Sequence, residues 1–334
     1  MAGYARAVQR SIPTDLILGG ATAAYQIEGA AAEDGRRPSI WDAFARVPGA
    51  VIDGHTGDVA CDHYHRMPAD VAMMRDLGLQ SYRFSTSWSR VCPDGGAPNA
   101  AGLDFYSRLV DELLDADIMP WLTLYHWDLP QVLEEAGGWP SRDTASRFVD
   151  YALAVHEKLG DRVDNWTTLN EPWCSSFLSY IAGAHAPGRQ SVADGLAAGH
   201  HLLLAHGMAV QALRDAGAER LGITLNFTVA DPVDPTNPFD VDAARRIDEQ
   251  YNRFFVDPIL RGSYPETLLA DVGHLGLDAV VQDGDLAIIG APIDDIWERA
   301  VRTVRADPDR YGFQFKGRIV APSHADPYIL ASCV

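Results

Sequence analysis

The sequence predicts an α/β fold of the incomplete (β/α)8 TIM-barrel type, with about five to six of the eight βα units. Short apolar runs rich in β-forming residues alternate with longer amphipathic runs, as in parallel sheets whose strands are joined by helices. Polar and aromatic residues follow the apolar runs directly, at the strand ends where such a barrel carries its active site. The chain has 334 residues, which is too few for eight units at the observed spacing.

Six apolar runs are predicted to be strands. They start at residues 16, 81, 118, 165, 220 and 286, and read LILGGATAA, SYRFSTSW, IMPWLTLYHW, NWTTLNEP, RLGITLNFT and LAIIGAPI. Four runs with apolar residues three or four positions apart are predicted to be helices, over 66–78, 101–117, 141–160 and 192–217. The strand starts at 16 and 286 imply about 54 residues per unit, so eight units would need about 430. No GxGxxG or P-loop pattern follows a strand, which argues against a doubly wound nucleotide-binding sheet.

The net charge and the cysteine spacing exclude several classes of binding partner. The formal net charge of -19 means that nucleic acids and anionic membrane surfaces would repel the chain. The four cysteines, Cys61, Cys92, Cys174 and Cys333, have no CxxC spacing, so we expect neither a zinc site nor a disulfide framework, and we predict a cytoplasmic location. A secretory leader is the alternative, because two arginines precede the run LILGGATAAY. No run reaches the roughly 20 apolar residues of a membrane span.

The stretch NWTTLNEPWC, residues 165–174, reads as a buried strand that ends on a carboxylic acid. The β-branched Thr167 and Thr168 favour a strand, and Pro172 ends it directly after Glu171. An isolated charge is costly to bury, so this glutamate either forms an ion pair or carries chemistry. Acid–base work on a sugar acetal needs a second carboxylate across the scissile bond.

Six stretches resemble, in the same order, those of the family 1 glycoside hydrolases, the retaining β-glucosidases and their relatives. They are ATAAYQIEGA (21–30), DHYHR (62–66), YRFSTSWSR (82–90), TLYHWDLPQ (123–131), TLNEPW (168–173) and GITLNF (222–227). The resemblance covers residues 16 to about 293. It implies hydrolysis of a small β-glucoside or oligosaccharide by double displacement, with no cofactor or metal. A non-catalytic sugar-binding or regulatory protein and a 6-phospho-β-glycosidase stay open as alternatives.

By this resemblance Glu171 is the general acid/base, which protonates the departing oxygen and then deprotonates a water. A general acid of this kind needs a raised pKa, so that it holds a proton near neutral pH. Arg83 corresponds to an arginine that pairs with the nucleophilic carboxylate.

The resemblance also implies a set of substrate-binding residues. Those expected to bind hydroxyls of the terminal sugar are Gln26, His126 and Asn170, whose amide and imidazole groups can both donate and accept hydrogen bonds. Trp127 and Trp173 match aromatic residues that a pyranose can lie against, and Asn226 matches a position on the aglycone side. A core histidine is the alternative for His126, and core packing for Trp173.

The other histidines do not indicate a metal site. Two lie in DHYHR, and three lie on a predicted helix at spacings of one and five; they are His63, His65, His200, His201 and His206. Neither group has the i, i+4 pair with an intervening carboxylate that a helical zinc site shows. Structural roles are therefore expected.

The resemblance stops at Asp294. The family's nucleophile lies in a Thr-Glu-Asn-Gly stretch, and none occurs in the sequence. Residues 294–334 carry six acidic and six basic residues and are neutral, so the preceding part holds the whole net charge. We therefore divide the chain into a partial β-glucosidase-type barrel, 1–293, and a divergent tail, 294–334, which a shifted reading frame would explain.

Two expectations follow from this division. The tail carboxylates Asp294, Asp295 and Glu298 are not expected to replace the nucleophile, because no strand pattern holds them at the roughly 5 Å separation of a retaining pair. An incomplete barrel has two open sheet edges, so self-association is expected.

Overall fold

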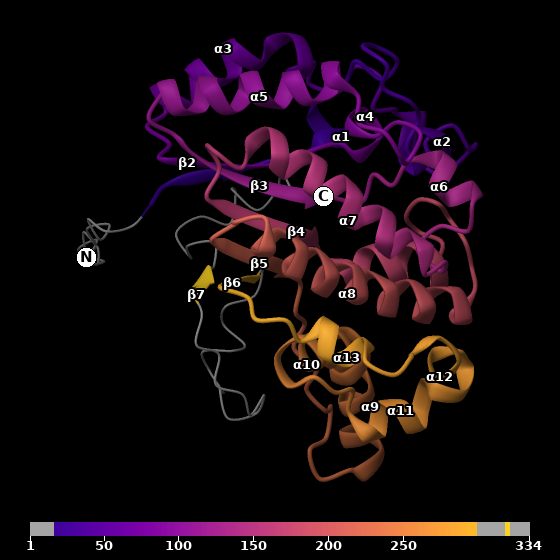
Figure 1. Cartoon of the computed structure of the whole chain (residues 1–334). Coiled ribbons are helices and arrows are strands. Elements are labelled where there is room, and N and C mark those ends of the chain that lie inside the picture. The colour runs from indigo at the N-terminus through magenta and orange to yellow at the C-terminus, as the bar shows by residue number, and fades with distance from the viewer. Residues whose placement is uncertain (1–16, 299–317, 321–334) are drawn as a thin grey trace, which may run out of the picture.

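The computed structural model describes residues 17–298 and 318–320. Within them, seven parallel strands form one curled sheet in the order β1 to β7 (Figure 1). The strands are β1 (Gly19–Ala21), β2 (Ser81–Ser85), β3 (Met119–Tyr125), β4 (Asn165–Asn170), β5 (Arg220–Leu225), β6 (Asp295–Glu298) and β7 (Arg318–Val320). Each strand pairs with the next one along the chain, which is the order of a (β/α)8 barrel. The first five predicted strands are confirmed.

The four predicted helices are also confirmed, and they cover the outer face of the sheet (Figure 1). They are α3 (His63–Asp76), α5 (Ala100–Asp115), α7 (Asp143–Leu159) and α8 (Val192–Asp215). The shorter helices are α1 (Ala24–Ile27), α2 (Ile40–Phe44), α4 (Trp88–Val91), α6 (Gln131–Glu135), α9 (Pro238–Asp248), α10 (Phe254–Arg261), α11 (Glu266–Val272), α12 (Leu277–Val280), α13 (Asp285–Ile289), the 3-10 turns η1 (Ile52–Gly54) and η4 (Gly273–Leu275), and the π-helical segments η2 (Cys174–Ile181) and η3 (Glu249–Arg253). No helix in the described ranges is long and apolar enough to cross a bilayer.

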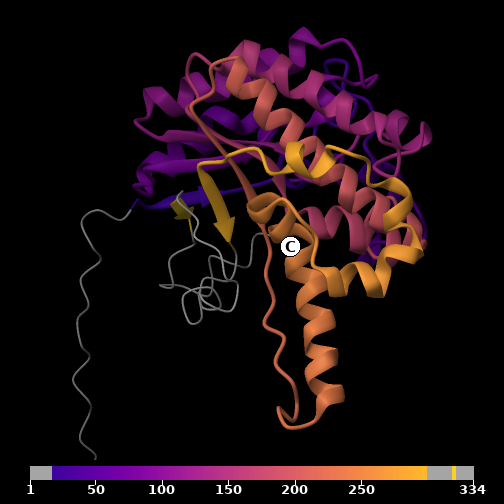
Figure 2. The same ribbon diagram turned by 60° about the horizontal axis from the view of Figure 1, so that its bottom comes forward.

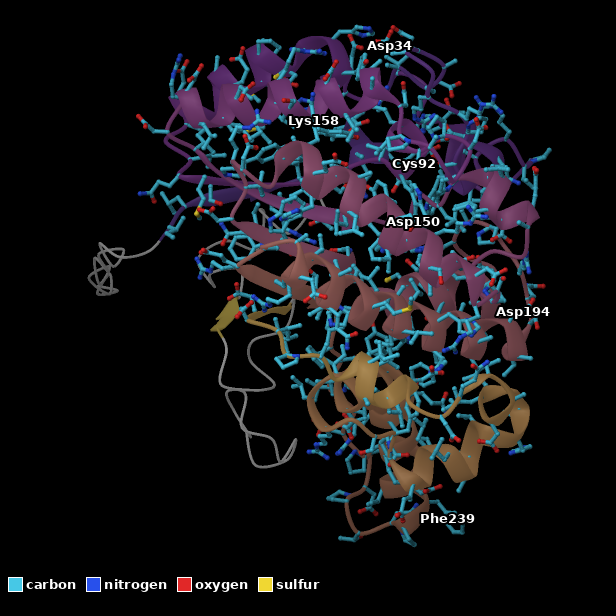
Figure 3. All side chains as sticks on the ribbon, in the orientation of Figure 1. Asp34, Cys92, Asp150, Lys158, Asp194 and Phe239 are labelled. Atoms are coloured by element: carbon cyan, nitrogen blue, oxygen red, sulfur yellow. The ribbon has the colours of Figure 1, made fainter. Side chains whose placement is uncertain are left out.

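The core lies between the sheet and this outer layer of helices, where side chains fill the space (Figure 3). Helices α5 and α7 present buried apolar faces at helical spacing, as their sequences predict. Trp88, which follows the second strand, is fully buried here and stacks on Tyr151 at a ring-centroid distance of 5.0 Å. Trp88 is thus part of the core.

Two expectations about the end of the chain are wrong. The run LAIIGAPI is not a strand, because residues Asp285–Ile289 form the short helix α13. An apolar run of this length does not distinguish a strand from a buried helix by periodicity. The sixth strand is instead Asp295–Glu298, which pairs with β5 in a register that aligns Glu298 with Leu225. A strand therefore does hold Asp295 and Glu298, contrary to the sequence-based reasoning.

Helix α13 packs closely on α8, and a buried charge network joins them. A Cβ at Gly207 of α8 would lie 2.1 Å from the carbonyl oxygen of Ile288, so the two helices need glycine here. His200 of α8 contacts Asp285 Oδ2 through Nε2 at 2.9 Å, and Arg142 Nη1 donates to the same oxygen at 2.8 Å. The contacts of Asp285 with His200 and Arg142 thus link the segment before β6 to helix α8.

An arm that the sequence did not predict leaves the sheet after β5. The segment 226–237 runs out and the helical run α9, η3 and α10 returns, so that the arm projects from the body (Figure 2, orange). Phe239, 83% exposed, lies at its far end (Figure 3). Asn252 of η3 fixes the base of the arm, because its Nδ2 donates to the carbonyl of Thr228 at 2.9 Å while its Oδ1 accepts from the Thr228 N–H at 3.0 Å.

The buried His206 of α8 is expected to make the free energy of unfolding depend on pH. It is fully buried, with Nδ1 2.7 Å from the hydroxyl of Thr168 in β4, and burial lowers its pKa to about 3. The unfolded chain protonates this histidine below about pH 6.5 and the folded chain does not, so stability is lost as the pH falls below that value. At about pH 5 the loss from one such histidine amounts to about 2 kcal/mol.

We therefore expect the difference in unfolding free energy between about pH 7 and about pH 5 to shrink by about 2 kcal/mol in His206→Asn. Urea unfolding at one fixed chain concentration measures it. The exposed His55 provides the control, and His55→Asn should leave the pH dependence unchanged. An unchanged pH dependence in His206→Asn would show that the folded chain takes up this proton.

Candidate active site

Glu171 lies at the carboxyl end of β4, where the strand is irregular. Thr167 pairs with Gly222 and Asn170 pairs with Thr224, so β4 has one more residue than β5 over this stretch. Such bulges re-aim side chains and are frequent beside active sites. Glu171 itself is buried and has a φ of 48°, a left-handed conformation that is unfavourable for a glutamate. The backbone thus holds this carboxylate in a strained position, which is common at functional sites.

Arg83, Asn170 and Trp127 connect the ends of β2, β3 and β4. The Arg83 guanidinium donates from Nη2 to Asn170 Oδ1 and from Nε to Thr123 Oγ1, both at 2.8 Å. The Trp127 indole donates from Nε1 to the Asn170 carbonyl at 2.9 Å, and Trp127 has a φ of 78°. Arg83 and Trp127 are therefore both hydrogen-bonded to Asn170, the residue before Glu171.

His126 is held in its neutral form. Burial, and after it the nearby Arg83 guanidinium, lower its pKa well below the ordinary value. Its Nδ1 is buried and has no hydrogen-bond partner within the described part of the chain. A neutral imidazole offers one donor and one acceptor, which suits a sugar hydroxyl. Two residues further along the chain Asp128 is fully buried, and burial raises the pKa of that carboxyl to about 8.

Gln26 lies in α1, directly after the segment that follows the end of β2. The chain between β1 and α1 follows the end of β2, because Thr22 N–H donates to the Arg83 carbonyl at 2.9 Å and Ala24 N–H donates to Ser85 Oγ at 2.8 Å. Gln26 follows in α1 and is half-buried. The structure thus places Gln26 beside the strand end that carries Arg83.

A second group of contacts lies on the opposite side of Glu171. Cys174 Sγ is 3.4 Å from Glu171 Oε2, and Asn226 Nδ2 is 3.8 Å from the same sulfur. Asn226, at the end of β5, also donates from Nδ2 to the Tyr251 hydroxyl at 3.0 Å. Tyr251 packs on Trp173 with ring centroids 4.1 Å apart. The predicted residues Trp173 and Asn226 are therefore brought together by a tyrosine from η3.

Sequence reasoning missed Cys174 and Tyr251 as members of this site. Cys174 follows Glu171 by three residues, at the start of η2, and this short separation along the sequence could have indicated the contact. Tyr251 lies far along the chain, in a segment with no predicted element. No local pattern signals its contact with Trp173 and Asn226.

The five histidines rejected as metal ligands each have a hydrogen-bond partner of another kind. The partners are Asp70 for His63, Asp62 and Glu33 for His65, Tyr264 and Asp285 for His200, the Trp139 carbonyl for His201, and Thr168 for His206. Among the described residues, Cys61, Cys92 and Cys174 form no disulfide, whereas Cys333 lies outside the described residues.

Comparison with known proteins identifies the family. The family described as glycosyl hydrolase family 1 matches residues 8–299. The chain belongs to this family. Within it, the chain is 54% identical over 291 residues to the thermostable beta-glucosidase B of Thermobispora bispora, and the match covers 85% of this chain and 58% of the relative.

Solved structures of family 1 beta-glucosidases share the fold. The psychrophilic enzyme of Micrococcus antarcticus is 60% identical with a TM-score of 0.83, over 85% of this chain and 61% of that one. The enzyme of Thermotoga maritima in complex with deoxynojirimycin is 40% identical with a TM-score of 0.82, over 86% of this chain and 65% of that one. The chain thus spans about three fifths of the length of these relatives, and its sheet is an incomplete (β/α)8 barrel.

Proposed function

We propose that the chain is of the β-glucosidase type and that its described residues form the acid/base and sugar-binding part of a retaining site. Hydrolysis by this chain alone is expected to be impaired, because the family's nucleophile stretch does not occur in the sequence. The observation that carries the proposal is Glu171, a buried carboxylate on strained backbone at a strand end, beside the bonded residues Arg83, Asn170 and Trp127. In this proposal Glu171 protonates the leaving oxygen, and Arg83 orients a nucleophilic carboxylate.

The glycone would be bound by three side chains that can donate and accept. They are the Gln26 amide, the neutral His126 imidazole and the Asn170 amide, with the Trp127 indole fixed beside them. Trp173 and Asn226 would lie toward the leaving group. The substrate class is a small β-glucoside, in keeping with the beta-glucosidases that the chain resembles. The cytoplasmic location remains a prediction from the scattered cysteines.

We also infer that residues 294–334 differ from the family-type segment 1–293. The match to the family ends at residue 299, close to this boundary, and the charge composition changes there. The segment nevertheless contributes β6 and β7 to the sheet. We therefore infer that this segment differs from the family in sequence but still pairs as strands of the sheet.

Binding of deoxynojirimycin, measured by titration calorimetry, tests the proposed function independently of turnover. We expect saturable binding by the chain and at least a tenfold weaker binding by Glu171→Gln and His126→Ala, a loss of about 1.4 kcal/mol or more. The matched control is Glu157→Gln on the exposed face of α7, which should bind as the unmodified chain does. Absence of saturable binding, or equal binding by Glu171→Gln, would contradict the proposal.

A further inference from the structure

A fully buried carboxyl group directly follows two of the sugar-binding candidates along the chain. Asp128 comes after His126 and Trp127, in the segment between β3 and α6, and its side chain is 0% exposed. Within the described part of the chain, neither of its carboxyl oxygens has a hydrogen-bond partner. Buried carboxylates are normally paired or hydrogen-bonded, so the charged form of this group is strongly disfavoured here.

Two buried hydrogen-bond donors follow the end of β2 in the same region. Ser87 Oγ and Trp88 Nε1 likewise have no hydrogen-bond partner among the described residues. Burial raises the pKa of the Asp128 carboxyl to about 8, and the Ser87 hydroxyl, the next largest influence, acts in the opposite direction. Trp88 stacks on Tyr151 of α7, and Asp128 is near enough to this tyrosine to add to the rise in its pKa that burial causes. The carboxyl thus lies between the β3–α6 segment and the helical layer.

The backbone around Asp128 is held from two sides. Ser89 Oγ donates to the Asp128 carbonyl at 3.5 Å, and the Ile40 N–H donates to the Leu129 carbonyl at 2.8 Å. The preceding Trp127 has a φ of 78°, and its indole N–H is bonded to the backbone at the end of β4. The orientation of Trp127 therefore depends on where the next residue is placed.

Two charged groups act on Asp128 from the side of α1. Glu28 raises the pKa of Asp128 and Arg36 lowers it, both less than burial does. Each of them has an opposite charge of its own: Arg90 Nε lies 3.0 Å from Glu28 Oε2, and Arg36 Nη2 lies 2.8 Å from Asp42 Oδ2. An ion pair favours the charged form of both partners, so these groups keep their charges at alkaline pH.

The other titratable neighbours stay neutral. Burial raises the pKa of Tyr125 and of Tyr151 well above the ordinary value. Burial also lowers the pKa of His126 well below its ordinary value, so that this imidazole carries no charge above about pH 6.5. Among the described groups around the β3–α6 segment, Asp128 is therefore the one whose charge changes between about pH 7 and about pH 9.

We propose that Asp128 is a positioning residue for the sugar side of the site, which as a neutral acid holds His126 and Trp127 in place and on losing its proton releases them. An unpaired carboxylate is costly to keep buried, so ionisation drives the side chain toward solvent and turns the backbone that carries its two neighbours. Carboxylic acids that burial keeps neutral occur in other enzyme sites. The inference rests on the proposed function and makes sugar binding sensitive to alkaline pH.

The test is the pH dependence of binding of an uncharged sugar by the full chain. Methyl 1-thio-β-D-glucoside carries no titratable group, and its dissociation constant is measured by calorimetry between about pH 6 and about pH 9. If only the form with a neutral Asp128 binds, the constant should rise roughly tenfold between about pH 7 and about pH 9.

Three variants assign this rise to Asp128. Asp128→Asn has a side chain of the same shape that is neutral at every pH, and it should show no alkaline rise. Ser87→Ala removes a hydroxyl that favours the ionised form, so the rise should move to higher pH. Asp150→Asn makes the matched change on the exposed face of α7 (Figure 3) and should keep the rise of the unmodified chain.

The outcomes separate this inference from the proposed function. Binding by the unmodified chain that does not weaken up to about pH 9 would overturn the inference and leave the proposed function standing. An equal rise in Asp128→Asn, or a rise at unchanged pH in Ser87→Ala, would do the same. If the unmodified chain binds neither this glucoside nor deoxynojirimycin at about pH 6, both are overturned.

Discussion

Incubated with nitrophenyl β-D-glucoside, the purified chain is expected to release no nitrophenol above the uncatalysed rate, with or without azide. A retaining site needs a second carboxylate about 5 Å from the first, and the family's Thr-Glu-Asn-Gly stretch does not occur in the sequence. Azide can replace a single lost carboxylate only where the remaining side chains of the site position the anomeric carbon for attack. Positioning of this kind supplies roughly 7–11 kcal/mol of barrier reduction, and an incomplete site that still binds the sugar does not provide it.

Two variants make this experiment decisive. Glu171→Gln removes the proposed acid/base, and Glu298→Gln removes a tail carboxylate. The backbone of Glu298 pairs with that of Leu225, the residue before Asn226. Turnover that disappears in Glu171→Gln would contradict the prediction. If Glu298→Gln abolished the same turnover, the divergent segment would be identified as the source of the second carboxylate. Glu157→Gln is the control for a charge change outside the site.

The strand-end rule indicated where candidate site residues would lie, because parallel strands bring their carboxyl ends to one edge. His126, Asn170 and Asn226 do lie at or directly after the ends of β3, β4 and β5, whereas Arg83, whose role rests on the resemblance, lies within β2. Their contacts could not be predicted. That Arg83 bonds to Asn170, and that Trp127 bonds to the Asn170 carbonyl, depends on the bulge in β4 and on positive φ angles, which have no simple sequence signal.

The later part of the fold was predicted poorly for another physical reason. The short run Asp285–Ile289 is apolar enough for a strand, and its helical state is set by packing against α8 at Gly207. The strand Asp295–Glu298 has only four residues, and pairing with β5 determines it. The arm, and with it the contact of Tyr251, depends on long-range hydrogen bonds such as those of Asn252. Tertiary context decides each of these elements.

The chain is also expected to self-associate in solution. In the described residues β1 pairs with β2 alone and β7 with β6 alone, so each has one edge whose N–H and C=O groups face no further strand. Such edges are templates for pairing with a second chain. Ile17 and Leu18, which lead into β1, are 51% and 43% exposed and add apolar surface at one edge. The net charge of -19 opposes association, and salt screens this repulsion.

Sedimentation velocity over a wide range of chain concentrations measures this association. We expect oligomers whose share grows with chain concentration and with salt. Leu18→Lys places a charge beside the β1 edge, as natural edge strands do, and should shift the equilibrium toward monomer at least severalfold. The matched control is Leu275→Lys in η4, where the leucine is 43% exposed, as Leu18 is, and lies outside the sheet. A sharp monomer at every concentration, or an equal effect of the two lysines, would show that these edges are not the contact.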